Sequence, residues 1–157
     1  MALVRILVDG YSLLHNWPEL APGRARHSAA AREELIQWLT RYQDASHTPV
    51  TVFFDGTGAK RKGTADEFAR QVEVLFSGTG QTADDLIERA AYRFREYGEV
   101  LVVTDDLAER DTITGLGGLT ASCASFLQML GQVETQLNQD LEQYNRRERA
   151  NYRRPKH

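Results

Sequence analysis

The chain has 157 residues, of which 41% are hydrophobic and 26% are charged, and its formal net charge is −3. This length fits one compact domain, and no apolar stretch approaches the roughly 20 residues that span a bilayer. The net charge argues against a strongly basic, general nucleic-acid binder. Because the N-terminus has no hydrophobic signal segment, we expect a cytoplasmic protein. A single cysteine, Cys123, excludes an internal disulfide and a cysteine-based zinc site.

The first third of the chain alternates strand-like and helix-like segments. An apolar strand over about 4–8 leads into a turn-rich loop over 9–18. Ser28 is a suitable N-cap for the helix that follows. The apolar residues of this helix recur at helical spacing: Ala31, Leu35, Trp38, Leu39 and Tyr42. Pro49 introduces a second strand over 50–54, which is nearly all apolar and is therefore expected to be buried on both faces.

The rest of the chain continues the alternation. Residues 72–76 alternate as in a half-exposed strand, and Thr82 with Asp85 forms a capping-box pattern at the start of a helix that Gly98 is placed to end. A third buried strand follows at 100–103. After a short helical turn and three glycines, a last long helix carries these apolar residues: Leu119, Cys123, Phe126, Leu127, Leu130, Val133, Leu137 and Leu141.

Strands that alternate with helices predict an α/β fold with a mainly parallel central sheet and right-handed crossovers. We expect residues 1–141 to form the domain and residues 142–157 to form a basic tail that continues the last helix. From Asp140 onward the chain carries six cations and three anions, so the preceding residues hold an excess of acids.

The acids are concentrated where the predicted strands end. Asp9, Asp55 and the pair Asp105–Asp106 each follow an apolar strand, and Asp84–Asp85 begins a helix. Because the carboxyl ends of parallel strands meet at one edge of a sheet, we expect these acids to converge. Clustered carboxylates repel one another unless a cation neutralises them, and Mg²⁺ or Mn²⁺ suits an all-oxygen site.

This arrangement fits phosphodiester hydrolysis. Two divalent ions held by shared carboxylates can activate water, neutralise charge on the phosphate and stabilise the leaving oxygen. We assign metal binding to the following residues: Asp9, Asp84, Asp85, Asp105 and Asp106. Asp55 has a supporting role. For any one acid taken alone helix capping is an alternative, and Asp106 with Glu109 forms another capping-box pattern.

Five motifs occur in the order and spacing typical of one family. They are Ile6–Tyr11, Trp17–Leu20, Val72–Phe76, Thr82–Asp85 and Val103–Asp106. Over nearly the whole chain they resemble the YacP-like branch of the NYN domains, which are relatives of PIN nucleases. The resemblance implies a three-layer α/β/α, PIN-like fold and a metal-dependent endoribonuclease that cleaves single-stranded RNA. It places Asp9, Asp84 and Asp106 on the acidic positions of the motif.

The chain departs from the family pattern at Ser12. The family usually has asparagine there, whose amide can orient a metal-bound water or a phosphate oxygen. Serine keeps a hydroxyl group with a shorter reach, and we count Ser12 among the catalytic candidates. Asp105 stands where the family often has a small polar residue, so it ranks below Asp106.

Two basic segments and one aromatic residue are candidate RNA contacts. The basic loop contains Lys60, Arg61 and Lys62, and the tail contains Arg146 and Arg147. Tyr11 flanks the first acid, where it either stacks on a base or packs under the loop. The candidate partners are RNA and the ribosome. Solvated charged surfaces are the alternative for both basic segments.

Other functions fit the sequence less well. No Walker A motif and no G-x-G-x-x-G fingerprint occur, so we expect no nucleotide cofactor. A haloacid-dehalogenase-type phosphatase needs a second aspartate two residues after its nucleophile, and Tyr11 and Thr57 occupy those positions after Asp9 and Asp55. A noncatalytic RNA- or ribosome-binding module with a decayed acidic site remains the main alternative, with Ser12 as its only sequence indication.

Overall fold

The structure is a computed structural model that describes residues 3–56 and 72–153. In chain order the elements are β1 (Leu3–Asp9), α1 (Gly10–His15), α2 (Ala29–Ser46), β2 (Val50–Phe54), β3 (Glu73–Phe76), α4 (Ala83–Phe94), β4 (Glu99–Val103), α5 (Leu107–Gly115), β5 (Leu119–Ala121) and α6 (Cys123–Arg153).

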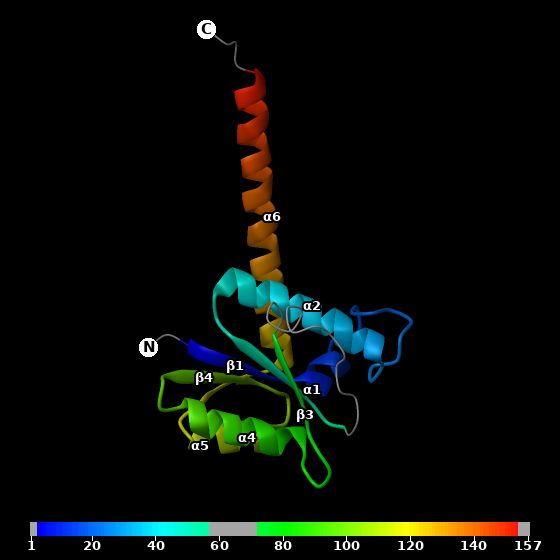
Figure 1. The fold of residues 1–157 in the computed structure, drawn as a ribbon, viewed down its shortest axis with the longest axis vertical. Helices are drawn as coiled ribbons and strands as arrows, with labels where there is room; N and C mark the ends of the chain where they lie inside the picture. Colours follow the sequence, from blue (N-terminus) through cyan, green and yellow to red (C-terminus); the bar gives the residue numbers. More distant parts are fainter. Residues whose placement is uncertain (1–2, 57–71, 154–157) are drawn as a thin grey trace.

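The five strands form one parallel sheet in the order β3-β2-β1-β4-β5. Helices α2 and α6 lie on one face of this sheet, and α4 and α5 lie on the other (Figure 1). The predicted α/β class, with its three layers and parallel sheet, is therefore confirmed.

The strands feed two separate cores because their side chains alternate between the faces. Ile6 and Val8 pack into the core under α2 and α6, whereas Leu7 packs into the core under α4. In β2, Phe54 packs into the core under α2 and α6, and Phe53 packs into the core under α4. All five residues of β2 are buried, as its apolar sequence predicts.

Helices α2 and α4 begin at the predicted caps. The Ser28 side chain accepts a hydrogen bond from the Ala31 amide, and Thr82 and Asp85 form a reciprocal capping box. Each bond satisfies an amide that the first helical turn leaves without a backbone partner. Helix α4 ends at Phe94 rather than at Gly98, and Gly98 instead has a positive φ of 145° just before β4.

The expectation of a turn-rich loop after β1 is wrong, because residues 10–15 form helix α1. Asp9 ends β1 and also caps this helix through the Ser12 amide. Gly10 allows the chain to turn here since a side chain at this position would overlap the Phe54 ring. A glycine at the first helical position is an unfavourable sequence signal for a helix, and tertiary packing overrides it.

The last helix starts four residues later than the position of Leu119 predicts. Leu119, Thr120 and Ala121 form the short edge strand β5, which pairs with β4. A strand of three residues is too short to show a period of two in the sequence. Cys123 then begins α6 and is fully buried, in agreement with its predicted place in the core.

Helix α6 extends well beyond the body of the domain (Figure 1). Its first turns are buried against α2, whereas Leu137, Leu141 and Tyr144 are 40%, 52% and 61% exposed. The helix continues without interruption through residues 141 and 142, where we placed the domain boundary. Among the described residues, no helix has the length and hydropathy that crossing a membrane requires.

Candidate active site

The site lies where the chain reverses its direction of travel across the sheet. From the central strand β1 the chain moves outward to β2 and β3, and it then returns to β4 on the other side of β1. The carboxyl ends of β1 and β4 therefore form the topological switch point, which is where open α/β sheets place their ligands. Asp9 is the last residue of β1, and Thr104 follows β4 directly.

Thr104 joins the acids of these two strands. It is fully buried, and its hydroxyl donates to Asp9 Oδ2 at 3.4 Å and accepts from the Asp106 amide at 3.2 Å. Asp9 Oδ1 accepts from the Ser12 amide at 3.3 Å. Both oxygens of Asp9 are thus held by the chain, which fixes the carboxylate at the sheet edge.

Asp84 reaches the same edge from the first turn of α4. Asp55, at the end of β2, fixes this turn because its Oδ1 accepts from the Ala83 amide at 2.6 Å. Ser77, which follows β3, donates to the same carboxylate at 3.4 Å. Asp55 thus connects the end of β2 with the residue after β3 and with the first turn of α4, next to Asp84. This contact is the form that a supporting role of Asp55 takes in the structure.

The acids are close enough to influence one another's ionisation. Burial raises the pKa of Asp9 to about 6, and the charges of Asp84 and Asp55 add to this rise, whereas the hydrogen bonds from Ser12 and Thr104 oppose it. The pKa of Asp84 is also raised, first by burial and then by the charges of Asp106 and Asp55. Asp84 therefore lies within electrostatic reach of both Asp9 and Asp106.

Two further carboxyl groups join this cluster. Glu109 on α5 is only 3% exposed, and its Oε1 has no hydrogen-bond partner among the described residues. Its pKa is raised to about 8 by burial, by the charge of Asp84, and by the neighbouring Glu88 on α4. The Glu109 carboxyl is therefore protonated at neutral pH.

Sequence reasoning missed both glutamates as site residues, although each had a signal. Glu88 lies four residues after Asp84 on the same helix, a spacing that places two side chains on one face. The sequence pattern assigns Glu109 only to a capping box with Asp106. Asp106 does cap α5, accepting from the amides of Ala108 and Glu109, but the Glu109 side chain points into the site. Only the packing of α4 against α5 brings the two glutamates together.

The side chains of Asp105 and Ser12 contact Cys123 at the start of α6 rather than the acidic cluster. The Asp105 carboxylate accepts from the amide of Cys123 at 2.8 Å, so it caps α6. The Ser12 hydroxyl accepts from the Asp105 amide at 3.3 Å and lies 3.5 Å from Cys123 Sγ. Burial raises the pKa of the Cys123 thiol to about 11, which keeps it protonated. Asn16 donates to the Ser12 carbonyl and therefore caps α1.

The remaining candidates have other surroundings. Asp85 is exposed and its carboxylate accepts from the Thr82 amide. Tyr11 packs between His27 and Phe54, with ring-centroid distances of 4.5 and 5.0 Å. Its hydroxyl accepts from Arg32, so this ring is held under the loop.

The basic candidates for RNA contact form two groups. Lys60, Arg61 and Lys62 lie outside the described residues. Arg146 and Arg147 are exposed on the projecting part of α6.

The donor chemistry of the cluster fits a hard divalent cation. Several carboxylates influence one another at one sheet edge, and a buried oxygen of Glu109 has no partner within residues 3–56 and 72–153. Within the described ranges, no three His, Cys, Asp or Glu side chains are close enough to hold one ion together. This spacing still suits Mg²⁺, which keeps several water ligands and is often bound by only one or two carboxylates.

Comparisons with known proteins agree with this architecture. The family model of the YacP-like NYN domain matches residues 6–156. The YacP protein of Bacillus subtilis (strain 168) is 32% identical over 136 residues, which are 84% of this chain and 78% of that protein. The crystal structure of Rae1 (YacP) from Bacillus subtilis is 30% identical, has a TM-score of 0.78, and is matched over 96% of this chain and 86% of that one. Its W164L mutant is 29% identical with a TM-score of 0.75, over 90% and 82% of the two chains.

Proposed function

The chain belongs to the YacP-like NYN domain family, a family of PIN-like nucleases, and from this we propose that it is a metal-dependent endoribonuclease that hydrolyses single-stranded RNA. One observation carries the proposal. Asp9, Asp84 and Asp106 come from three separate segments, Asp84 lies within electrostatic reach of the other two, and Thr104 links Asp9 to the Asp106 backbone. Helix capping accounts in part for the position of Asp106, which caps α5. It does not account for the proximity of Asp9 and Asp84, whose negative charges repel each other.

We assign Mg²⁺ or Mn²⁺ to the edge that carries Asp9, Asp84 and Asp106, with each ion held by one or two of these carboxylates and by water. Such a bound ion supplies Lewis-acid stabilisation of the phosphate and lowers the pKa of a water ligand. Asp85 and Asp105, which cap α4 and α6, contribute in this proposal through water rather than directly. The buried carboxyl of Glu109 adds negative charge behind Asp84 once it is ionised.

The chain itself performs the positioning. The Ser12 amide and the Thr104 hydroxyl orient the Asp9 carboxylate and favour its ionised form. The bond from Ala83 to Asp55 fixes the first turn of α4 and with it Asp84. Ionised, rigidly held carboxylates at this edge bind cations without a reorganisation cost, which is the protein's contribution to an electrostatic mechanism.

The RNA contacts in this proposal lie around that edge. Tyr11 is next to the acids, although it is packed, and Lys60, Arg61 and Lys62, which follow β2 in the sequence outside the described residues, are further candidates. Arg146 and Arg147 on the projecting helix offer a separate cationic surface for RNA, including ribosomal RNA. A cytoplasmic location and association with the ribosome belong to the same proposal.

The test is cleavage of an end-labelled single-stranded RNA with Mg²⁺ or Mn²⁺, followed on a denaturing gel. We expect internal cleavage by the wild type, no cleavage in EDTA, and a loss of about 100-fold or more for Asp9→Asn and Asp84→Asn. Asp44→Asn is the matched control because Asp44 is an exposed aspartate on α2, away from the site. Intact RNA with ample metal and wild-type protein would refute the proposal.

A decayed, noncatalytic RNA-binding module is the second candidate. The observation that favours it is the position of Ser12, whose hydroxyl is engaged by the Asp105 amide and approaches Cys123. The Ser12 hydroxyl therefore does not point to the acidic cluster. The asparagine that the family usually has at this position is longer, and its amide can reach the cluster. RNA binding that is insensitive to EDTA, without cleavage, supports this alternative.

A further inference from the structure

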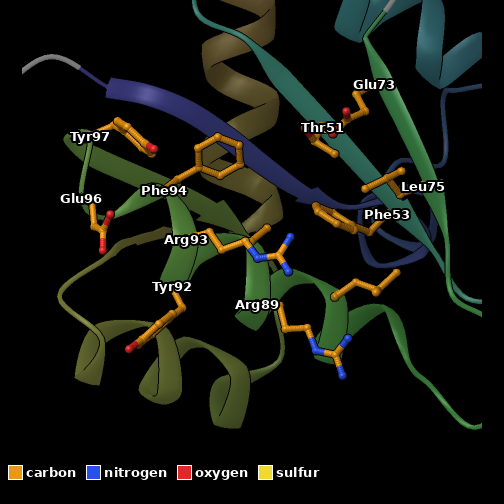
Figure 2. Close-up of a pocket in the computed structure, with 12 residues that line it drawn as sticks. Thr51, Phe53, Glu73, Leu75, Arg89, Tyr92, Arg93, Phe94, Glu96 and Tyr97 are labelled. Atoms are coloured by element: carbon orange, nitrogen blue, oxygen red, sulfur yellow. Dashed lines mark hydrogen bonds between the residues drawn. The ribbon is translucent and has the colours of Figure 1, made fainter.

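A pocket of about 680 Å³ lies between α4 and the strands β2 and β3, apart from the acidic cluster (Figure 2). It exists because α4 packs chiefly against the central strands and leaves part of the edge strand β3 uncovered on this face. Leu75 of β3 is 40% exposed there, and Tyr97 at the other end is 73% exposed. We call this feature the α4 pocket.

The α4 pocket combines an apolar wall with two cations. Its larger apolar and aromatic lining residues are Phe53, Leu75, Leu86, Phe94 and Tyr97. The side chains of Arg89 and Arg93 leave α4 on the same side and extend toward β2 and β3 (Figure 2). The acids of the pocket lie toward its margins: Glu73 accepts a hydrogen bond from Thr51, and Glu96 follows the end of α4.

The two guanidinium groups have no electrostatic partner in the part of the chain that the structure describes. Among the described residues, neither Arg89 nor Arg93 forms an ion pair or a hydrogen bond through its side chain, and the ion pair found there joins Arg41 to Glu134. Other arginines of this fold are engaged, since Arg5 stacks on Phe94 and Arg95 stacks on Tyr92. A pair of free guanidinium groups beside an apolar wall matches a ligand with both anionic and flat apolar parts.

Helix α4 connects this pocket to the candidate active site. Asp84 lies in its first turn at the acidic edge, and Arg89 and Arg93 follow on the same helix. At about 1.5 Å of rise per residue, Arg93 lies about 13 Å along the helix from Asp84. One extended ligand can therefore contact both.

We propose that the α4 pocket binds single-stranded RNA, with phosphates at Arg89 and Arg93 and bases against the exposed side chains of Leu75 and Tyr97. This inference rests on the proposed function, because it takes the strand in the pocket to be the continuation of the strand at the acids. Arginine recognises phosphate in a bidentate manner, and base stacking on aromatic side chains does not depend on sequence. An acidic peptide matches the arginines but leaves the aromatic and aliphatic wall without a specific partner.

The test is fluorescence anisotropy with fluorescein-labelled oligouridylates of about 4 and about 12 nucleotides, titrated with full-length protein in EDTA at several salt concentrations. We expect Arg89→Ala/Arg93→Ala to weaken binding of the longer RNA about tenfold or more and to reduce the slope of log affinity against log salt by about 1.4. The shorter RNA is long enough to fill the α4 pocket alone, so its weaker binding should depend on the same two arginines.

The matched control is Arg24→Ala/Arg41→Ala, which removes the same charge from residues that neither line the α4 pocket nor stack on its lining residues. Its affinity for the longer RNA should remain within about twofold of that of the wild type. Arg89→Lys/Arg93→Lys provides a second comparison that keeps the charge and the helix. It should retain most of the salt dependence but lose part of the affinity, because lysine cannot form the bidentate contact.

The outcomes separate this inference from the proposed catalysis. Arginine-dependent binding of the longer RNA without any cleavage in Mg²⁺ or Mn²⁺ supports the pocket and refutes the catalysis. Cleavage by the wild type together with equal RNA binding by wild type and both arginine variants overturns the pocket and leaves the catalysis standing. Binding of a labelled oligoglutamate in preference to RNA, lost in the alanine variant, also overturns it.

Discussion

The Thr104 hydroxyl donates to Asp9 Oδ2 at 3.4 Å across 95 positions of sequence, so the ends of β4 and β1 are joined at the acids. This bond favours the ionised form of Asp9 and lowers its pKa, in opposition to the effect of burial. Thr104 also accepts from the Asp106 amide, so one buried hydroxyl serves both predicted metal ligands.

Thr104→Val should raise the pKa of Asp9 further above its present value of about 6. Valine has nearly the same shape but cannot donate, so Asp9 loses a stabilising contact in its charged form. Carboxyl-carbon NMR titration measures the shift, and the acid limb of any cleavage profile should move to higher pH. Thr112→Val, which removes an exposed hydroxyl from α5, serves as the control; an equal Asp9 pKa in both variants would exclude the role given to Thr104.

Glu109→Gln should change how stability depends on pH. The pKa of Glu109 rises from 4.5 to about 8 on folding, so the folded state binds the proton more tightly than the unfolded state. Its contribution is fully present below about pH 4.5 and is lost as pH rises through about 8. Glutamine stays neutral, so at pH 8 in EDTA we expect the variant to exceed the wild type in free energy of unfolding by about 1–3 kcal/mol.

Urea denaturation at several pH values between 5 and about 9 measures this difference. Glu142→Gln, which changes an exposed glutamate on α6, is the control and should leave the pH dependence unchanged. Parallel stability profiles for the wild type and Glu109→Gln would show that the Glu109 carboxyl is not protonated in the folded protein.

Gly10→Ala should destabilise the protein, because the added methyl group overlaps the Phe54 ring at the start of α1. We expect a loss of about 1–3 kcal/mol in the free energy of unfolding, as for other additions to a filled core. Gly131→Ala is the matched control, because this glycine lies within α6 with open space around it and alanine favours helix by about 0.5–1 kcal/mol. Thermal denaturation compares the two, and combining Gly10→Ala with Phe54→Leu should recover part of the loss.

The Cys123 thiol should be unreactive in the folded protein. It is fully buried, and its pKa is raised to about 11, mainly by burial. Because the thiolate is the reactive form, modification by a disulfide reagent at pH 8 should be slower than that of a free cysteine by roughly 100-fold or more. The same reaction in denaturant is the control, and fast modification of the native protein would contradict the burial of this side chain.

The sequence contained enough local information to predict the elements that start at strong caps. Ser28 and the pair Thr82 and Asp85 begin helices at the expected residues, because side-chain capping acts over three residues and leaves a local pattern. Helix α1 was missed since Asp9 is both a strand end and an N-cap. Strand β5 was missed because three residues carry no measurable period.

The acidic site was predictable only in part. The placement of Asp9 and Asp106 at one edge follows from the parallel strands that precede them, and Asp84 lies at the start of the helix that follows β3. The separation of Asp105 from the cluster does not follow from strand order, because the direction of this side chain depends on the free amide at the start of α6. Glu88 and Glu109 meet through helix packing, which single-sequence patterns do not record.

The central place of β1 also determines when the site can exist during synthesis. This strand is made first, yet one of its two neighbours, β4, is formed by residues about 95 positions later in the chain. Contacts between such distant segments are slow to form because a long loop must close before they are gained. A nascent chain that ends before β4 therefore has Asp9 without Thr104 or Asp106, and the assembled acidic edge appears only when about two thirds of the chain has been made.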